Sequence, residues 1–179
     1  MALKLCLGIL TALVLFLGYV STRTSLFRYE RSGVIQASPE TIFPYISNFR
    51  LGEHWSPYEK KDPAMKKTFI GPDAQVGSVM EFDGNAAAGS GKIELLMLVP
   101  NERVQMKLFM TKPITAENLV EYTLTPEAGG GTRFTWTMSG DGGFMGKLVA
   151  TLIDCEKLVA DDFTVGINNL KELIEKQKI

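Results

Sequence analysis

The sequence predicts an α+β domain in which an antiparallel sheet of about six or seven strands is covered by one long C-terminal helix, with a transmembrane helix ahead of the domain. Three observations lead to this fold class. Apolar and polar residues alternate in several middle segments, apolar residues recur every three or four positions in the last part, and residues 5–20 carry no charge. With 179 residues, 45% hydrophobic and 22% charged, the chain suits one domain with a sizeable core.

The run LCLGILTALVLFLGYV at residues 5–20 predicts a membrane segment. Its sixteen residues are fewer than the roughly 20 that cross a hydrocarbon core, but Ala2 and Leu3 lengthen it if Lys4 extends toward the headgroups. A cleaved signal peptide is the alternative. It is less favoured because residues 18–22 offer only poor versions of the small-residue cleavage motif.

We therefore expect a single-pass membrane anchor, or an uncleaved signal, at residues 1–22, a connector at residues 23–27 and a folded domain at residues 28–177. Positive charge near the anchor is nearly balanced, because the amino terminus and Lys4 precede it and three arginines follow it. The positive-inside rule therefore does not assign the side of the membrane on which the domain lies. The three arginines are Arg23, Arg28 and Arg31.

The folded domain is expected to begin with a strand and two short helical segments. Residues 28–36 have strand character. The sequence ASPE at residues 37–40 is a helix start, in which Ser38 suits the N-cap and Pro39 the first helical position. Residues 51–57 are expected to form a second helical turn.

A series of strands follows. Val104, Met106 and Leu108 alternate with polar neighbours, and the same alternation recurs around Phe134 and Trp136. This pattern is typical of an antiparallel sheet with one covered face. One expected strand ends at residues 69–70. The others span residues 78–83, 92–99, 103–109, 119–125 and 132–139, with a hairpin loop at residues 127–131.

Residues 144–176 predict a long amphipathic helix. Its apolar positions are three or four residues apart, which is the helical period. Gly166 falls inside this pattern, and we expect a break near it. The apolar positions are Leu148, Leu152, Cys155, Val159, Phe163, Ile167, Leu170 and Ile174.

Composition excludes several kinds of function. The net charge of −1, the pI near 5.9 and the scattered lysines and arginines argue against a nucleic-acid partner. The chain has two cysteines, Cys6 and Cys155, and Cys6 lies in the apolar N-terminal run. With His54 as the only histidine, the usual zinc ligands cannot be assembled. We expect neither a metal nor a cofactor.

Several short motifs occur in order along the predicted domain. They are ASPETIF from residue 37, WSPYE from residue 55 with DP following, GS before a strand, DGN from residue 83 to Gly91, TRFTW from residue 132 and GINNLK from residue 166. The motifs and the order of elements resemble the SRPBCC superfamily, and in particular its polyketide cyclase/dehydrase-like branch. This superfamily includes START lipid-transfer domains, birch-pollen-type allergens and activators of the Hsp90 ATPase.

The resemblance covers essentially residues 28–177 and implies the helix-grip fold, a curved sheet that grips the long helix around a mostly apolar cavity. Bulky residues expected to face this cavity are the candidate ligand contacts, with Trp55 at the cavity rim. Each taken singly is also consistent with ordinary core packing, whereas methionines among them suit an irregular ligand. The set is Trp55, Tyr58, Phe82, Met97, Met106, Trp136, Leu152, Val159 and Phe163.

Candidate catalytic residues are few. His54 could serve as a general base, but Glu53 is adjacent in sequence and is therefore a poor group to orient it. Glu81 and Asp83 share one face of a predicted strand, where two carboxyls could perturb each other's pKa. Alternation places both toward solvent. We predict no catalytic residue, with His54 as a weak candidate.

The sequence thus favours a membrane-tethered domain that binds a hydrophobic small molecule or lipid in an apolar cavity. One alternative is an enzyme of the polyketide cyclase or dehydratase kind, with His54 or a cavity carboxylate as the base. A second is a protein-interaction module of the co-chaperone kind. These three hypotheses belong to different classes, and only the geometry of the site distinguishes them.

Overall fold

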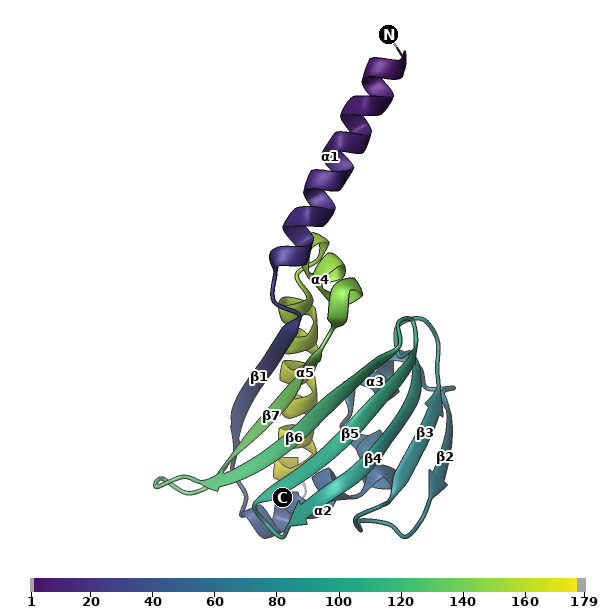
Figure 1. The fold of residues 1–179 in the computed structure, drawn as a ribbon. Coiled ribbons are helices and arrows are strands. Elements are labelled where there is room, and N and C mark those ends of the chain that lie inside the picture. The colour runs from purple at the N-terminus through teal and green to yellow at the C-terminus, as the bar shows by residue number, and fades with distance from the viewer. Residues whose placement is uncertain (1, 177–179) are drawn as a thin grey trace.

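The computed structural model describes residues 2–176 and shows one antiparallel sheet that curves around a long C-terminal helix (Figure 1). The seven strands lie in the order β1-β7-β6-β5-β4-β3-β2, so the first and last strands are neighbours and every other neighbour is consecutive in the chain. The predicted α+β fold class is confirmed. The strands are β1 (Leu26–Ile35), β2 (Lys66–Ile70), β3 (Val79–Asp83), β4 (Ser90–Val99), β5 (Arg103–Lys112), β6 (Ala116–Pro126) and β7 (Thr132–Asp141).

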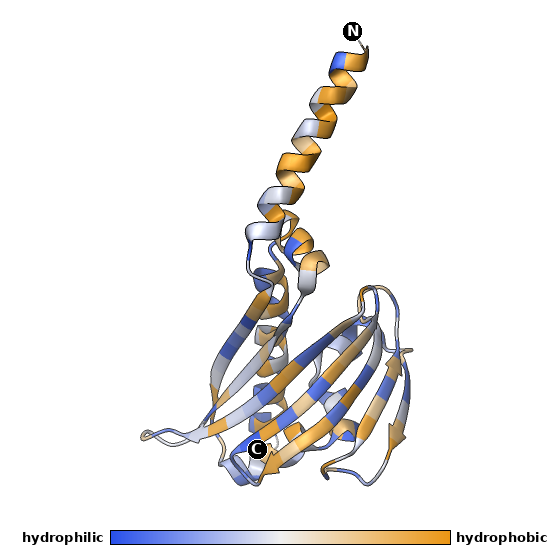
Figure 2. Cartoon of the chain, in the orientation of Figure 1, coloured by the Kyte–Doolittle hydropathy of each residue, from blue (hydrophilic) through white to orange (hydrophobic). Residues whose placement is uncertain are grey.

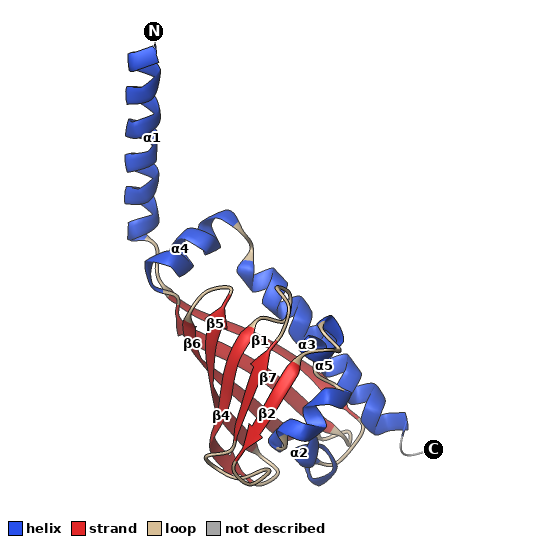
Figure 3. Ribbon diagram, turned by 90° about the vertical axis from the view of Figure 1, so that its right-hand side faces the viewer, coloured by secondary structure: helices blue, strands red, loops and turns tan. Residues whose placement is uncertain are grey.

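Helices cover the concave face of the sheet and extend beyond one of its ends (Figure 3). Three short helices connect β1 to β2, and the two C-terminal helices follow β7. The first helix projects away from the domain. The helices are α1 (Ala2–Thr22), α2 (Pro39–Ser47), the 3₁₀ helix η1 (Phe49–His54), α3 (Pro57–Lys61), α4 (Gly143–Leu152) and α5 (Cys155–Lys176).

The alternation seen in the sequence fixes the two faces of the sheet. Met106 on β5 lies opposite Val120 on β6, and Val120 lies opposite Met138 on β7. Trp136, two residues from Met138, lies opposite Tyr122. Because side chains along a strand point alternately to opposite faces, these residues form continuous apolar rows on the concave side.

The hydrophobic core is formed where α5 packs against the concave face near β1. The approach is close at Gly33, where a Cβ atom would lie 2.7 Å from Cγ2 of Ile167. Glycine there lets the helix lie directly on the strand. Buried members of this core include Ile35, Ile42, Leu124, Phe134, Ile167, Leu170 and Ile174.

The predicted C-terminal helix is divided into α4 and α5, and the expected break near Gly166 is wrong. The break lies at Ile153, which has extended backbone, and at Asp154, whose Oδ1 accepts a hydrogen bond from the Lys157 backbone N–H at 2.9 Å. Such a side-chain acceptor stabilises a helix start. Gly166 instead stays helical, and a Cβ atom there would lie 2.6 Å from Cζ3 of Trp136 and 3.0 Å from Cδ of Pro57. This glycine is explained by close packing.

The N-terminal helix α1 is the one helix among residues 2–176 that is long and apolar enough to cross a membrane, a test that a signal sequence also passes. β1 begins at Leu26, two residues before the predicted strand, so the link between α1 and the sheet is shorter than the expected connector at residues 23–27. The expected end of the domain at residue 177 and the first residue of the expected anchor lie outside the described residues.

Candidate functional site

A cavity of about 290 Å³ lies between the concave face of the sheet and the helices that cover it. Its floor comes from β3 to β7, and its cover comes from α2, η1, α3 and Phe163 of α5. The volume is close to the lower end of the range of roughly 300–1,000 Å³ that is usual for small-molecule sites.

Methionine side chains form the flexible part of the cavity wall. Five of the eight methionines line the cavity, namely Met65, Met80, Met106, Met110 and Met138. The methionine side chain is unbranched and polarizable, so it adapts to apolar ligands of differing shape. A wall of this kind is suited to a hydrophobic ligand.

Aromatic rings form the stiff part of the wall. Trp136 stacks on Phe163 with ring centroids 4.3 Å apart, and Trp55 meets Trp136 edge to face at 5.6 Å. Trp55 is only 3% exposed, and its Nε1 donates a hydrogen bond to the Tyr45 carbonyl at 3.0 Å. Asn169 Nδ2 in turn donates to the Trp55 carbonyl at 3.0 Å. Trp55 is thus a fixed part of the buried wall, whereas the sequence suggested a rim.

The carboxylate of Glu59 at the cavity wall forms an ion pair with Lys67. Glu59 lines the cavity, and its Oε2 lies 2.7 Å from Nζ of Lys67; the two side chains are 12% and 18% exposed. Burial raises the pKa of Tyr58 above its ordinary value, with a further contribution from the nearby Asp162 carboxylate, and burial likewise raises the pKa of Tyr122. Both hydroxyls are therefore neutral across the physiological range.

Two residues that line the cavity each contain a buried polar atom. Asn118 Oδ1 and Trp136 Nε1 have no hydrogen-bond partner among residues 2–176, and both residues line the cavity. A buried polar atom without a partner is costly. The wall thus combines a large apolar area with a few uncharged polar groups.

The structure brings six of the nine predicted contact residues to the cavity. They are Trp55, Tyr58, Phe82, Met106, Trp136 and Phe163. They come from the residue that follows η1, from α3, from the sheet and from α5, so residues far apart in the sequence meet around one space. Their contact with a ligand stays a prediction.

The other three predicted residues do not line the cavity. A bulge between Leu95 and Met97 shifts the register of β4, so Met97 lies opposite Gln105 on the outer face and is 40% exposed. A bulge of this kind reverses the side-chain alternation that follows it. Leu152 ends α4, outside the sheet, and Val159 packs against the core cluster.

Sequence reasoning omitted several lining residues. Val120, Tyr122 and Met138 share the alternating face of Met106 and Trp136, so the same pattern could have included them. Other lining residues lie outside the strands and show no periodic signal. Met65 and Ala88, which lie in connections between elements, are two examples.

The weak catalytic candidate His54 lies outside the cavity lining. Its side chain is 51% exposed, and Nε2 is 3.9 Å from Oε1 of Glu53. Glu81 and Asp83 line a shallow outer depression, separate from the cavity. A hydrogen bond from Ser90 Oγ at 2.6 Å, with Lys112 nearby, lowers the pKa of Asp83. Within residues 2–176 no three His, Cys, Asp or Glu side chains gather as a metal site.

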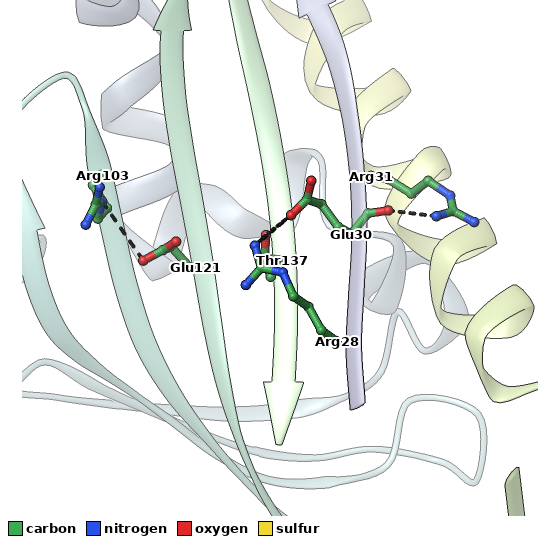
Figure 4. Close-up of polar contacts among 6 residues, drawn as sticks. All are labelled: Arg28, Glu30, Arg31, Arg103, Glu121 and Thr137. Carbon is green, nitrogen blue, oxygen red and sulfur yellow. Dashed lines mark hydrogen bonds and ion pairs between the residues drawn. The ribbon is translucent and has the colours of Figure 1, made fainter. Parts of the chain in front are cut away.

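Part of the outer face of the sheet, on β1, β7, β6 and β5, carries polar and charged side chains (Figure 4). Glu30, Thr137, Glu121 and Gln105 lie opposite one another on adjacent strands. Arg28 Nη2 lies 2.7 Å from Glu30 Oε2, to which Thr137 also donates a hydrogen bond at 3.2 Å. Exposed pairs of this kind contribute little to stability. This part of the outer face is a solvated surface, and the apolar site belongs to the concave face.

A curved antiparallel sheet closed by a long C-terminal helix, with an apolar cavity between them, defines a helix-grip domain. Residues 27–175 match the model of a family described as polyketide cyclase / dehydrase and lipid transport. The chain belongs to this family. No curated relative matches the sequence.

Solved structures share the fold at low sequence identity. Protein CV1439 from Chromobacterium violaceum is 20% identical, covers 84% of this chain and 97% of its own, and has a TM-score of 0.58. Protein SA2116 from Staphylococcus aureus is 15% identical over 86% and 96%, with a TM-score of 0.63. The Aha1 dimer from Colwellia psychrerythraea is 20% identical over 83% and 96%, with a TM-score of 0.58. At these identities the likeness concerns the fold.

Proposed function

We propose that this protein binds a neutral hydrophobic small molecule or lipid in the cavity between the sheet and the helices, while α1 tethers the domain to a membrane. The observation that carries the proposal is the cavity of about 290 Å³, with its methionine and aromatic wall. The family description, which includes lipid transport, supports the same class of ligand. We expect ligand contacts from Trp55, Tyr58, Phe82, Met106, Trp136 and Phe163.

A neutral ligand is expected because the wall offers an ionised group no counter-charge. The Lys67 ammonium is held by Glu59, and a carboxylate entering the cavity would meet the Glu59 carboxylate without gaining a cation. Burial of an unpaired ion costs several kcal/mol. The buried polar atoms of Asn118 and Trp136 favour a ligand whose apolar body carries one uncharged polar group, such as an ester or an alcohol.

The tether rests on the properties of α1. The helix has 21 residues and a mean hydropathy of 2.2 over its most apolar window, and almost none of that window is buried against the domain. An α-helix rises 1.5 Å per residue, so its length matches a hydrocarbon core of about 30 Å. A tethered cavity suits a ligand that is itself poorly soluble in water.

Native mass spectrometry of the full-length chain, released from detergent micelles, tests the binding proposal. We expect a bound neutral ligand of hydrophobic composition, either copurified or taken up from added methyl laurate. Val120→Phe places a larger side chain at the cavity wall and should abolish uptake. Leu119→Phe is the matched control, because Leu119 is the preceding residue of the same strand and faces outward. Equal uptake by both variants, or none by the wild type, would overturn the proposal.

Ligand charge is tested by competition against N-phenyl-1-naphthylamine, a neutral fluorescent probe. At pH 7 methyl laurate should displace the probe at a concentration at least about tenfold below that needed for laurate, because only laurate must bury an ion. Lowering the pH through the fatty acid's own pKa should raise the affinity for the acid and leave that for the ester unchanged. Tighter binding of ionised laurate would contradict a neutral-ligand site.

An enzyme of the cyclase or dehydratase class is the second candidate, because Glu59 places a carboxylate at the cavity wall. Its ion pair with Lys67 makes Glu59 a poor general base as it stands, since a base must be free to accept a proton from the substrate. Glu59→Gln separates the two candidates. Loss of conversion of a bound polyketide with binding retained would favour the enzyme, whereas a carrier requires no such carboxylate.

A further inference from the structure

The helix α4 is apolar and uncovered. Its sequence GFMGKLVATL contains one charged residue, Lys147, and none of its residues is buried. Phe144, Met145 and Leu152, with Ile153 just beyond the helix, are between 46% and 68% exposed. A helix that is apolar on most sides is normally covered by protein or by lipid. Here the domain covers little of it.

The position of α4 is fixed against the domain-proximal end of α1. The two helices pack against each other, and Lys147 Nζ donates a hydrogen bond to the Ser21 carbonyl at 3.0 Å. Next to α4, the Gly142 N–H donates to the Ser25 carbonyl at 3.0 Å. Figures 1 and 3 show α4 beside the base of α1, beyond the end of the sheet, and Figure 2 shows apolar residues along both helices. The apolar surface of α1 thus continues onto α4.

We propose that α4 lies in the headgroup and upper acyl region of the bilayer, as an interfacial helix that holds the domain against the membrane. This rests on the proposed function, in which α1 spans the membrane. If α1 spans, its end at Thr22 marks the membrane surface, and α4 must lie at the same level. Ten residues make a helix about 15 Å long, too short to cross the core and suited to lie along it.

The charged groups near α4 are of both signs, because Arg23 follows α1 and two aspartates flank α4, so the contact does not require an anionic lipid surface. Lys147 is engaged by the Ser21 carbonyl. Asp141 before the helix and Asp154 after it are both exposed and would repel anionic headgroups. Burial of exposed apolar area is therefore the driving force, and each fully buried large side chain contributes about 1.5–3 kcal/mol.

The contact would also place one end of the cavity at the bilayer. β7 runs through Met138, which lines the cavity, to Asp141, and α4 starts at Gly143. Asn118, another lining residue, lies opposite Gly140. The cavity therefore reaches the end of the sheet that α4 holds to the membrane. A hydrophobic ligand could pass between lipid and cavity with little exposure to water.

Depth-dependent fluorescence quenching of the full-length chain in phosphatidylcholine vesicles tests the inference. Single cysteines are introduced by Met145→Cys, Leu10→Cys and Val76→Cys in a background with Cys6→Ser and Cys155→Ser, and each is labelled with an environment-sensitive fluorophore. Val76 is the matched control, because it is 61% exposed and lies in the β2–β3 connection at the opposite end of the sheet. Lipids with a nitroxide at a shallow acyl position should quench the label at 145 several-fold more than the label at 76.

The three positions distinguish the inference from the proposed tether. Quenching at 10 but not at 145 would keep the tether and overturn the interfacial helix, and quenching at neither would overturn both. A blue-shifted label at 145 that lipid nitroxides do not quench would indicate a second protein copy on α4, which also contradicts the proposal. In a Leu152→Cys labelled chain, Phe144→Asp with Met145→Asp should reduce quenching, and Val76→Asp should not.

Discussion

The concave face of the sheet is covered in two different ways. Where α5 packs on the sheet, strand residues such as Ile35 and Phe134 and the α5 residue Leu170 are fully buried, and we call this the packed half. Beneath η1 and α3, residues such as Met106 and Met138 face the cavity, and we call this the open half. One sheet therefore supplies both a stabilising core and a binding space.

The difference lies in the covering elements and in the side chains beneath them. α5 is 22 residues long with a regular apolar stripe, and glycines at positions 33 and 166 let it approach the sheet closely. The open half is covered by α2, η1 and α3, which have nine, six and five residues, and by Phe163 of α5, and these short segments do not fill the face. Branched and aromatic residues suit the packed half, whereas methionine suits a space whose contents vary.

The largest predicted effect separates the two halves directly. Leu170→Ala should destabilise the protein by about 2–5 kcal/mol, because it opens a void in a filled region. Met138→Ala should cost less than half as much, because its side chain already borders a cavity, and it should admit bulkier ligands. Urea unfolding in micelles, followed by tryptophan fluorescence, measures both. Equal costs would mean that the halves do not differ.

The Lys67–Glu59 pair tests the electrostatics of the open half. Lys67→Met should cost about 2–3 kcal/mol, because it leaves the Glu59 carboxylate at the wall without a partner, discounted for partial exposure. Adding Glu59→Gln should restore most of the loss. Lys176→Met, which removes an exposed pair with Glu172, is the control and should change the unfolding free energy by less than about 0.5 kcal/mol. A negligible effect of Lys67→Met would argue against a desolvated wall.

Gly166 lies where α5 passes Trp136, at the boundary between the packed half and the open half. Gly166→Ala should destabilise by about 1–2 kcal/mol: overpacking costs about 1–3 kcal/mol, and the better helix propensity of alanine offsets up to about 1 kcal/mol. It should also weaken probe binding by displacing Trp136. Gly146→Ala is the control, since Gly146 is also helical, lies outside the cavity lining, and a Cβ atom there meets nothing within 4 Å. Comparable thermal shifts for both variants would contradict the close approach.

The smallest effect concerns alkaline pH. Burial raises the pKa of Tyr122 in the folded protein, so the stability that comes from its neutral form is complete below the unfolded pKa of about 10. It is lost as pH rises above that value, by at most about 1.4 kcal/mol per pH unit. Tyr122→Phe should flatten the fall in stability between about pH 10 and 11. An unchanged slope would mean that Tyr122 is not desolvated.

The regular strands and helices could be predicted from the sequence, whereas the bulge and the connections could not. Alternation around Met106 and Trp136 and the period of the last helix describe regular elements, so the fold class and the lining residues Phe82, Met106, Trp136 and Phe163 followed from them. Met97 was misplaced because a bulge within the uniformly apolar LLML of β4 leaves no signal in the pattern. Met65 and Ala88 lie in connections, where position depends on tertiary packing and has no period.

Methionine methyl NMR shows directly whether a hydrophobic ligand enters the cavity between the sheet and its helices. The full-length protein, labelled with ¹³C at the methionine ε-methyl groups and held in micelles, would be titrated with N-phenyl-1-naphthylamine. We expect shifts at the five cavity methionines, Met65, Met80, Met106, Met110 and Met138, and none at Met97 on the outer face. Saturable shifts at Met97, with the five cavity signals unmoved, would contradict a binding site between the sheet and its helices.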